Sequence, residues 1–131
     1  MNARYPIAGV LWLAVGLLLG QNLAYHPDPK WQAPARAARR PNPLAGRRDV
    51  LAGGRRLYVR ECLACHGGDG SGLGHAANLR ATQMKQQSDG TLFWKLATGN
   101  LRRGMPSFSH LPEIERWQLI DYLRTLDRKG G

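Results

Sequence analysis

The distribution of hydrophobic positions divides the chain into three parts. Residues 7–20 are apolar throughout, and this run extends to residue 24 if two polar residues lie near a membrane interface. Residues 25–48 contain five prolines and many arginines, and their apolar residues show no period. From residue 49 the apolar residues recur at helical spacing, and no segment alternates convincingly as a strand. The pattern predicts an N-terminal apolar segment at 1–24, a linker at 25–48 and an all-α domain at 49–131.

The first predicted helix of the domain leads into a pair of cysteines. Asp49 can cap its N-terminus. The residues that share one face of it are Val50, Leu51, Gly54, Leu57 and Tyr58. Gly54 and Tyr58 lie one turn apart, and a glycine there lets another helix cross closely. The last helix, with Leu119 and Tyr122, is the expected partner in that crossing.

Two longer helices and one short helix complete the predicted domain. The segment SDGTLFWKLATGN is capped by Ser88 or Asp89 and can be closed by Gly99 in a left-handed conformation. A polar, glycine-rich stretch before it is predicted as loop, with one short helix at Thr82–Gln86. Pro112 suits the first turn of the last helix. The broad apolar face of that helix is formed by Ile114, Trp117, Leu119, Ile120, Tyr122, Leu123 and Leu126. A core this thin usually needs a metal, a disulfide or a cofactor.

Basic residues are concentrated in the predicted linker and in the helix after it. Of the formal net charge of +10, +7 falls on residues 28–60 and +2 on residues 61–131. Nucleic-acid binders often carry such a charge, but no recognition-helix, zinc-finger or RNA-binding signature accompanies the arginines. We therefore expect no nucleic-acid partner. The basic stretch is interpreted as a solvated linker, with an acidic protein surface or anionic lipid as the alternative partner.

The apolar N-terminal segment has the features of an export signal. Residues 7–20 match the hydrophobic region of a signal peptide and, extended to residue 24, a short membrane anchor. Small residues are not spaced as a cleavage site requires, so we expect an uncleaved anchor, and a cleaved signal peptide is the alternative. Basic residues directly after the segment would, by the positive-inside rule, leave the C-terminal domain in the cytoplasm. The cysteine motif favours the opposite side of the membrane.

Both cysteines of the chain lie in the stretch ECLACHGGDGSGLG. Cys62, Cys65 and His66 form the Cys-x-x-Cys-His sequence at which c-type haem is attached. In that chemistry two thiols add to the two vinyl groups of the porphyrin, and the adjacent histidine supplies a nitrogen to the iron. A thioredoxin-type disulfide would need a preceding strand, and a structural zinc site would need four ligands. Because neither context is visible, we favour haem; a Cys-x-x-Cys disulfide or metal site is the alternative.

A methionine in the loop before the last helix completes the expected ligand set. Met105 lies 39 residues after His66, between Gly104 and Pro106. Thioether sulfur is a soft ligand that favours ferrous iron and so raises the reduction potential. Met84 is the other candidate, but it lies in the predicted short helix and is expected to pack on the haem or the core.

These segments resemble class I c-type cytochromes with one haem, of the short bacterial kind found free, membrane-tethered or as subunits of oxidases and dehydrogenases. The resemblance covers about residues 49–127, through the motifs GRRLYVRECLACHGGDGSG, NL, SDGTLFWKLATG, GMPSF and RWQLIDYLRTL. It implies a small cytochrome c fold of three to four helices around one covalently bound haem c. It also assigns Cys62 and Cys65 to the thioether bonds. His66 would then be the proximal iron ligand, and Met105 the distal one.

One position departs from that family. A proline often precedes the NL element, where a backbone carbonyl accepts a hydrogen bond from the second nitrogen of the proximal histidine. Ala76 and Ala77 stand there in this chain. Whether a carbonyl still orients His66 is therefore a question for the structure.

Four further residues are candidates for contacts to the haem propionates or the haem pocket. Arg102 and Arg103 carry the charge that suits propionates, and solvated loop charge is the alternative for both. Trp94 or Tyr58 could also reach a propionate, although the aromatic residues equally suit packing around a large apolar ring.

The resemblance implies electron transfer without a catalytic site. With both axial positions filled by protein, no coordination site stays open for oxygen or peroxide chemistry. Respiratory or dehydrogenase redox proteins, some with an acidic docking surface, would be the partners. The expected location is the periplasmic side of a bacterial inner membrane, with residues 7–24 as anchor if they are uncleaved. An obligate cytochrome subunit of a larger oxidoreductase complex is the alternative, and a haem-free basic interaction module is the more remote one.

Overall fold

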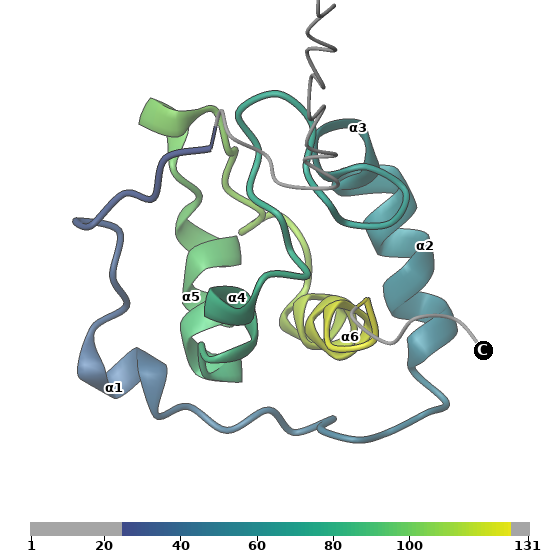
Figure 1. Cartoon of the computed structure of the whole chain (residues 1–131). Coiled ribbons are helices and arrows are strands. Elements are labelled where there is room, and N and C mark those ends of the chain that lie inside the picture. The colour runs from purple at the N-terminus through teal and green to yellow at the C-terminus, as the bar shows by residue number, and fades with distance from the viewer. Residues whose placement is uncertain (1–24, 127–131) are drawn as a thin grey trace, which may run out of the picture.

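A computed structural model describes residues 25–126 of the chain (Figure 1). Its helices are α1 (Ala35–Ala38), α2 (Leu51–Glu61), α3 (Leu63–His66), α4 (Thr82–Lys85), α5 (Asp89–Thr98) and α6 (Glu113–Leu123), and a 3-10 turn η1 (Leu101–Arg103) lies between the last two. No strand occurs between residues 25 and 126, which confirms the predicted all-α class. No helix in this part of the chain is long and apolar enough to cross a membrane. The apolar segment predicted at 1–24 lies outside the described residues.

Helices α2 and α6 cross at a glycine, as the sequence predicts. Figure 1 shows α6 nearly end-on beside α2. A Cβ atom placed on Gly54 would lie 2.2 Å from the carbonyl oxygen of Gln118 and 2.8 Å from the Cβ of Tyr122. One turn further along α2, the rings of Tyr58 and Tyr122 meet at 5.3 Å between centroids. The close crossing therefore depends on the missing side chain at position 54.

The core forms where α5, α6 and α2 meet. Tyr58, Leu119 and Ile120 are the largest fully buried side chains. Phe93 of α5 stacks on Trp117 of α6, with 4.0 Å between ring centroids. These contacts bury most of the apolar positions predicted on the helical faces, although Ile114 of α6 is 49% exposed. Most of the predicted faces are therefore core faces.

The N-terminus of α2 differs from the predicted cap. The helix begins at Leu51, with Val50 in the N-cap position and no side-chain cap hydrogen bond. The carboxylate of Asp49 forms an ion pair with Arg47 instead. The prediction that Asp49 caps the helix is therefore wrong, because a nearby guanidinium takes the carboxylate that would have bonded the backbone.

The ends of α5 follow the prediction more closely. Ser88 is the N-cap residue, and its hydroxyl accepts a hydrogen bond from the backbone N–H of Thr91 at 3.1 Å. Gly99 closes the helix with a positive φ of 61°, but its ψ of −174° is extended rather than left-handed helical. A Cβ atom there would lie 2.5 Å from the carbonyl group of Pro106, so the glycine also allows the chain to return close to α5.

Residues 25–48, called the N-terminal strap from here on, pack against the domain. The strap contains the short helix α1 and passes along α5 and α6 before it enters α2 (Figure 1). Leu44 is only 5% exposed and belongs to the core. The guanidinium of Arg40 lies 4.5 Å from the centroid of the Phe93 ring and forms an ion pair with Glu113 at 2.5 Å. This packing differs from the free, solvated linker that the missing hydrophobic period predicts.

Candidate haem site

The Cys-x-x-Cys-His sequence forms a single tight turn at the end of α2. Cys62 is the C-cap residue of α2 and the N-cap residue of α3, and α3 carries Cys65 and His66. The backbone N–H of Cys62 bonds to the carbonyl of Tyr58 at 2.8 Å, and the N–H of His66 bonds to the carbonyl of Cys62 at 2.9 Å. The two thiols and the imidazole therefore come from adjacent turns of nearly continuous helix.

The two thiols differ in exposure. Cys62 is 7% exposed, and burial, with smaller contributions from the charges of Glu61 and Cys65, raises the pKa of its thiol to about 12. Cys65 is exposed. No disulfide joins the two sulfur atoms. Both sulfur atoms are therefore free to form separate covalent bonds.

A backbone carbonyl orients the imidazole of His66. The Nδ1 atom of His66 lies 2.9 Å from the carbonyl oxygen of Ala77, which accepts a hydrogen bond from the Nδ1–H group. Burial lowers the pKa of His66, and the bond to Ala77 partly offsets this. The ring is therefore held neutral with Nε2 left as the acceptor, which is the form that binds a metal. The carbonyl that the resemblance implies is therefore present, although alanine stands where a proline was expected.

The glycine-rich loop after His66 folds back onto the motif. Gly72 donates to the carbonyl of His66 at 2.9 Å, and a Cβ atom on Gly72 would lie 2.9 Å from the Ala77 carbonyl oxygen. The φ of Gly72 is +88°, a conformation that favours glycine. The loop therefore brings the Ala77 carbonyl to the histidine because glycine permits both the turn and the close approach.

Tyr58, one of the four candidates for a propionate or pocket contact, is bonded within the protein. Its buried hydroxyl donates to the carbonyl of Gly67 at 2.5 Å, so its single proton is used within the loop. Trp94 is half-buried on α5. Arg102 and Arg103 are exposed on η1, directly before Met105. All four residues remain candidates for the haem pocket, and the hydroxyl of Tyr58 also fixes the start of the glycine-rich loop.

Met105 lies in a loop that the protein holds at both ends. The backbone N–H of Asn100 donates to the carbonyl of Met105 at 2.8 Å, and the N–H of Met105 donates back at 3.1 Å. After the methionine, the hydroxyl of Ser107 donates to the carbonyl of Ala97 at 2.6 Å. The side chain of Met105 is half-buried and packs against the core. Met84 of α4 has the same character, so burial alone does not separate the two thioethers.

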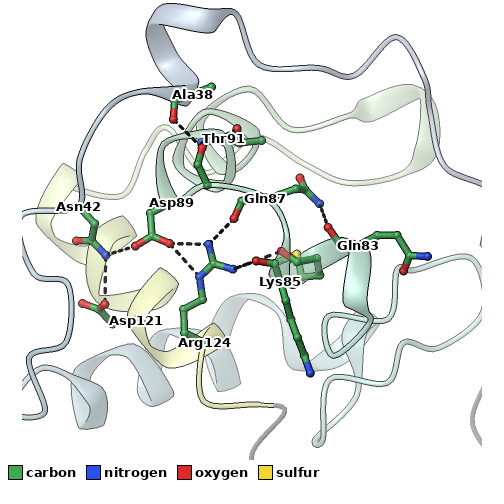
Figure 2. A network of polar contacts seen from close by, with 11 residues as sticks. Ala38, Asn42, Gln83, Lys85, Gln87, Asp89, Thr91, Asp121 and Arg124 are labelled. Atoms are coloured by element: carbon green, nitrogen blue, oxygen red, sulfur yellow. Dashed lines mark hydrogen bonds and ion pairs between the residues drawn. The ribbon is translucent and has the colours of Figure 1, made fainter.

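A polar network ties α4 and α5 to the end of α6, as Figure 2 shows. Arg124 forms an ion pair with Asp89 at 2.6 Å and donates to the backbone carbonyls of Gln87 and of both residues that end α4. On the other side of Asp89, the amide of Asn42 donates to its carboxylate at 3.0 Å and to Asp121 at 3.2 Å. This network fixes the segment that carries Met84 against the helix framework.

Sequence reasoning missed the residues that hold the loops in place. These are polar residues that belong to no motif: Asn42, Asn100 and Arg124. The partners of Asn42 and Arg124 lie between 35 and 79 positions away along the chain. Asn100 is bonded to Met105 across a turn. An asparagine directly after the helix-ending Gly99 was the one local sign that position 100 has a structural role. Within residues 25–126, no three or more His, Cys, Asp or Glu side chains are grouped to hold a metal ion.

Comparison with known proteins favours haem attachment at the Cys-x-x-Cys-His sequence over a disulfide or metal site. The family model described as "Cytochrome C oxidase, cbb3-type, subunit III" matches residues 49–123. The chain belongs to this family. The crystal structure of the c-type cytochrome XoxG from Methylobacterium extorquens AM1 is similar, with 31% sequence identity and a TM-score of 0.51. That match covers 60% of this chain and 50% of the XoxG chain. No curated protein sequence matches the chain.

Family membership confirms the class I c-type cytochrome that the sequence motifs resemble. The family match and the similarity to a c-type cytochrome support covalently bound haem c and haem-based electron transfer. The residues of this chain fit that group. Two sulfur atoms without a disulfide flank a turn that ends in an oriented, neutral imidazole, and thioether sulfur is available from a fixed loop.

Proposed function

We propose that the haem iron of this cytochrome is held between Nε2 of His66 and the thioether sulfur of Met105. The observation that carries the histidine assignment is the 2.9 Å contact between its Nδ1 atom and the Ala77 carbonyl. The methionine assignment is supported by its place in a half-buried loop whose backbone is bonded to Asn100. When bound, the haem supplies an iron that exchanges one electron between its ferrous and ferric forms.

The thiols of Cys62 and Cys65 would hold the porphyrin covalently. Each S–H would add across one vinyl group, with the sulfur bonded to one carbon and the hydrogen to the neighbouring carbon, so the attachment would need no oxidant. Because Cys62 and Cys65 lie within one turn of His66, the two covalent bonds would hold the porphyrin beside the imidazole. The protein then supplies position and electrostatics, and the cofactor supplies the redox chemistry.

The two axial side chains determine what the site can do. The Ala77 carbonyl raises the basicity of the His66 imidazole and prevents its rotation. The thioether of Met105 favours the ferrous form, which raises the reduction potential. With both axial positions occupied by side chains, the iron would have no open coordination site for small molecules. The protein would then carry single electrons.

Replacing each methionine tests the ligand assignment. In Met105→Ala we expect a reduction potential lower by on the order of 100 mV, a fraction of the roughly 0.8 V over which axial ligands set haem potentials. We also expect the ferric protein to bind added imidazole more tightly. Met84→Ala is the matched control, because its side chain is half-buried in the same core. If Met84→Ala produces these changes and Met105→Ala does not, the distal ligand is Met84.

The proposal also covers the cellular location of the protein and its attachment to the membrane. Bacterial c-type cytochromes are typically periplasmic, and we infer that residues 7–24 anchor this chain on the periplasmic side of the inner membrane. An intact mass from separate membrane and soluble fractions tests this. A membrane-bound mass of the full chain plus one haem supports the anchor, and a soluble mass that lacks residues 1–24 supports a cleaved signal peptide. A mass without haem contradicts covalent attachment.

A second candidate function follows from the family description, which names an oxidase subunit. In that case the cytochrome works only inside a larger complex, and the basic strap and the arginines of η1 contact an acidic face of a neighbouring subunit. Stable co-purification with larger subunits in mild detergent, lost at high salt, favours the subunit. A cytochrome that elutes alone and exchanges electrons with a diffusing partner favours the independent carrier.

A further inference from the structure

The first residues of the strap are bonded to the loop that carries Met105. The side-chain amide of Asn100 donates to Oδ2 of Asp28 at 2.9 Å, across 72 positions of the chain. In Figure 1 this part of the strap begins next to η1 and the loop that follows α5. The contact joins the segment that follows residue 24 directly to the candidate haem site.

Asn100 connects Asp28 to the methionine through its own backbone. Its N–H and carbonyl form the two hydrogen bonds of 2.8 and 3.1 Å to Met105. Its carbonyl also accepts from the N–H of Arg103 at 2.9 Å, which closes η1. The side chain of this residue therefore contacts the strap while its main chain holds the methionine.

Asp28 is itself fixed before it meets the loop. Its Oδ1 atom accepts from the backbone N–H of Lys30 at 3.0 Å, and its carbonyl accepts from the N–H of Trp31 at 3.1 Å. These two bonds close a turn that presents Oδ2 to Asn100. The bond to Asn100, with the Lys30 bond second, lowers the pKa of the carboxyl group, so it is ionised at neutral pH.

A second contact holds the same turn against the end of α5. The indole N–H of Trp31 donates to the hydroxyl of Thr98 at 3.4 Å. The ammonium group of Lys95 lies 4.6 Å from the centroid of the Trp31 ring. The turn therefore spans the C-terminal end of α5 and the first residue after Gly99, where the methionine loop begins.

The geometry points to Asp28 as a positioning residue for the distal ligand. It holds Asn100, Asn100 holds the backbone of Met105, and the fixed loop keeps the thioether sulfur at the iron. The strap thus acts as a clamp on the methionine loop. This inference rests on the proposed ligation by Met105, so its test must separate the two.

Competition by imidazole measures the clamp directly. Imidazole binds ferric iron only where the methionine has left, so its apparent affinity rises as the methionine bond weakens. Imidazole is largely neutral above pH 8, which limits effects of protein charge. The measurement is an absorbance titration of the purified ferric haem protein, with the full strap present.

Three single variants, one double variant and a control separate hydrogen bonding from charge. Asp28→Ala removes the acceptor, and we expect imidazole affinity to rise about two- to fivefold. Asp28→Asn keeps an oxygen acceptor without the charge, and we expect a change of less than about twofold. Asn100→Ala should raise the affinity as Asp28→Ala does, and the double variant should add nothing further. Asp49→Ala, which removes an exposed carboxylate paired with Arg47, should match the wild type.

The same imidazole titration in the Met105→Ala background distinguishes a wrong ligand assignment from a wrong clamp. If Met105→Ala alone leaves the imidazole affinity unchanged, the ligation is wrong and the clamp falls with it. If Met105→Ala raises the affinity while Asp28→Ala does not, the clamp alone is overturned. An effect of Asp28→Ala that persists in the Met105→Ala background also overturns it, because the residue would then act elsewhere. Loss of the effect in that background supports the clamp.

Discussion

Asp121 is placed where its charge opposes folding, and this gives a testable dependence of stability on pH. The residue lies on α6 and is 8% exposed. Its Oδ1 atom accepts from the amide of Asn42 at 3.2 Å, but its Oδ2 atom is buried without a hydrogen-bond partner. Burial, followed by the neighbouring charge of Asp89, raises its pKa to about 6, and the hydrogen bonds from Asn42 and from the backbone of Gly46, with Arg124 after them, only partly offset this. We predict that Asp121→Asn stabilises the protein at neutral and higher pH.

The structure sets the sign and the size of the effect. The pKa rises from an ordinary value of 3.8 to about 6, which corresponds to about 3 kcal/mol. We expect about 1–2 kcal/mol, because Asp121→Asn leaves a buried amide in place of the carboxylate and recovers only part of this free energy. Well below the ordinary pKa of 3.8 the carboxyl is protonated in both folded and unfolded chains, and Asp121 does not lower the free energy of unfolding. Above 3.8 the unfolded carboxyl ionises first, so the stability of the wild type falls. As pH rises through about 6 the folded carboxyl ionises as well, and the loss is complete.

Guanidinium unfolding of the ferric protein at pH 4, 5, 6, 7 and 8 measures the effect. We expect the free energies of unfolding of Asp121→Asn and wild type to converge at pH 4 and to separate at pH 8. Glu113→Gln is the control on the same helix, since Arg40 lowers the pKa of Glu113 and the wild-type carboxylate stabilises at high pH. An Asp121→Asn difference that is independent of pH, or larger at pH 4 than at pH 8, would refute the reasoning.

Two further predictions concern the helix crossing and the loop after the cysteines. Gly54→Ala should lower the free energy of unfolding by about 1–3 kcal/mol through overpacking. Gly53→Ala is its matched control and should cost less, because its new Cβ meets only a flexible glutamine side chain. Tyr58→Phe removes the buried bond to the Gly67 carbonyl and should cost about 1–2 kcal/mol in the same denaturation assay. An unchanged unfolding midpoint in Tyr58→Phe would show that the loop holds its shape without the hydroxyl.

The helix framework could be predicted from sequence because its causes are local or periodic. Gly54 and Tyr58 lie one turn apart on a face that repeats every three to four residues, and that spacing alone indicated the crossing with α6. The Ser88 cap depends on a backbone N–H three residues later, so it too was visible. The Asp49 cap failed because a competing partner, Arg47, lies just as close in the sequence. A local pattern shows that a residue can form a bond, but not which of two neighbours takes it.

The contacts of the strap could not be predicted, since each is made by a single side chain. Arg40 lies over the Phe93 ring, Asn42 joins two carboxylates, and Leu44 fills the core. These side chains follow no period and reach partners on distant helices. The prolines and arginines around them have the composition of a solvated linker. Composition therefore describes the exposed side of the strap, whereas its packing depends on a few residues that only the fold brings into contact.

The two loops of the candidate haem site are held by different parts of the chain. The cysteine–histidine turn is held from within the matched family region, by the bonds from Tyr58 to Gly67 and from His66 to Ala77. The methionine loop is held in part from outside that region, since Asp28 precedes residue 49, where the match begins. A small helical domain buries little core, so a contact added from outside can change the stability of one loop without changing the other. If residues 1–24 are the membrane anchor, the strap that positions the distal ligand follows the anchor directly in the chain. A partner that displaces the strap would then break the bond between Asp28 and Asn100 and weaken the support of the methionine loop.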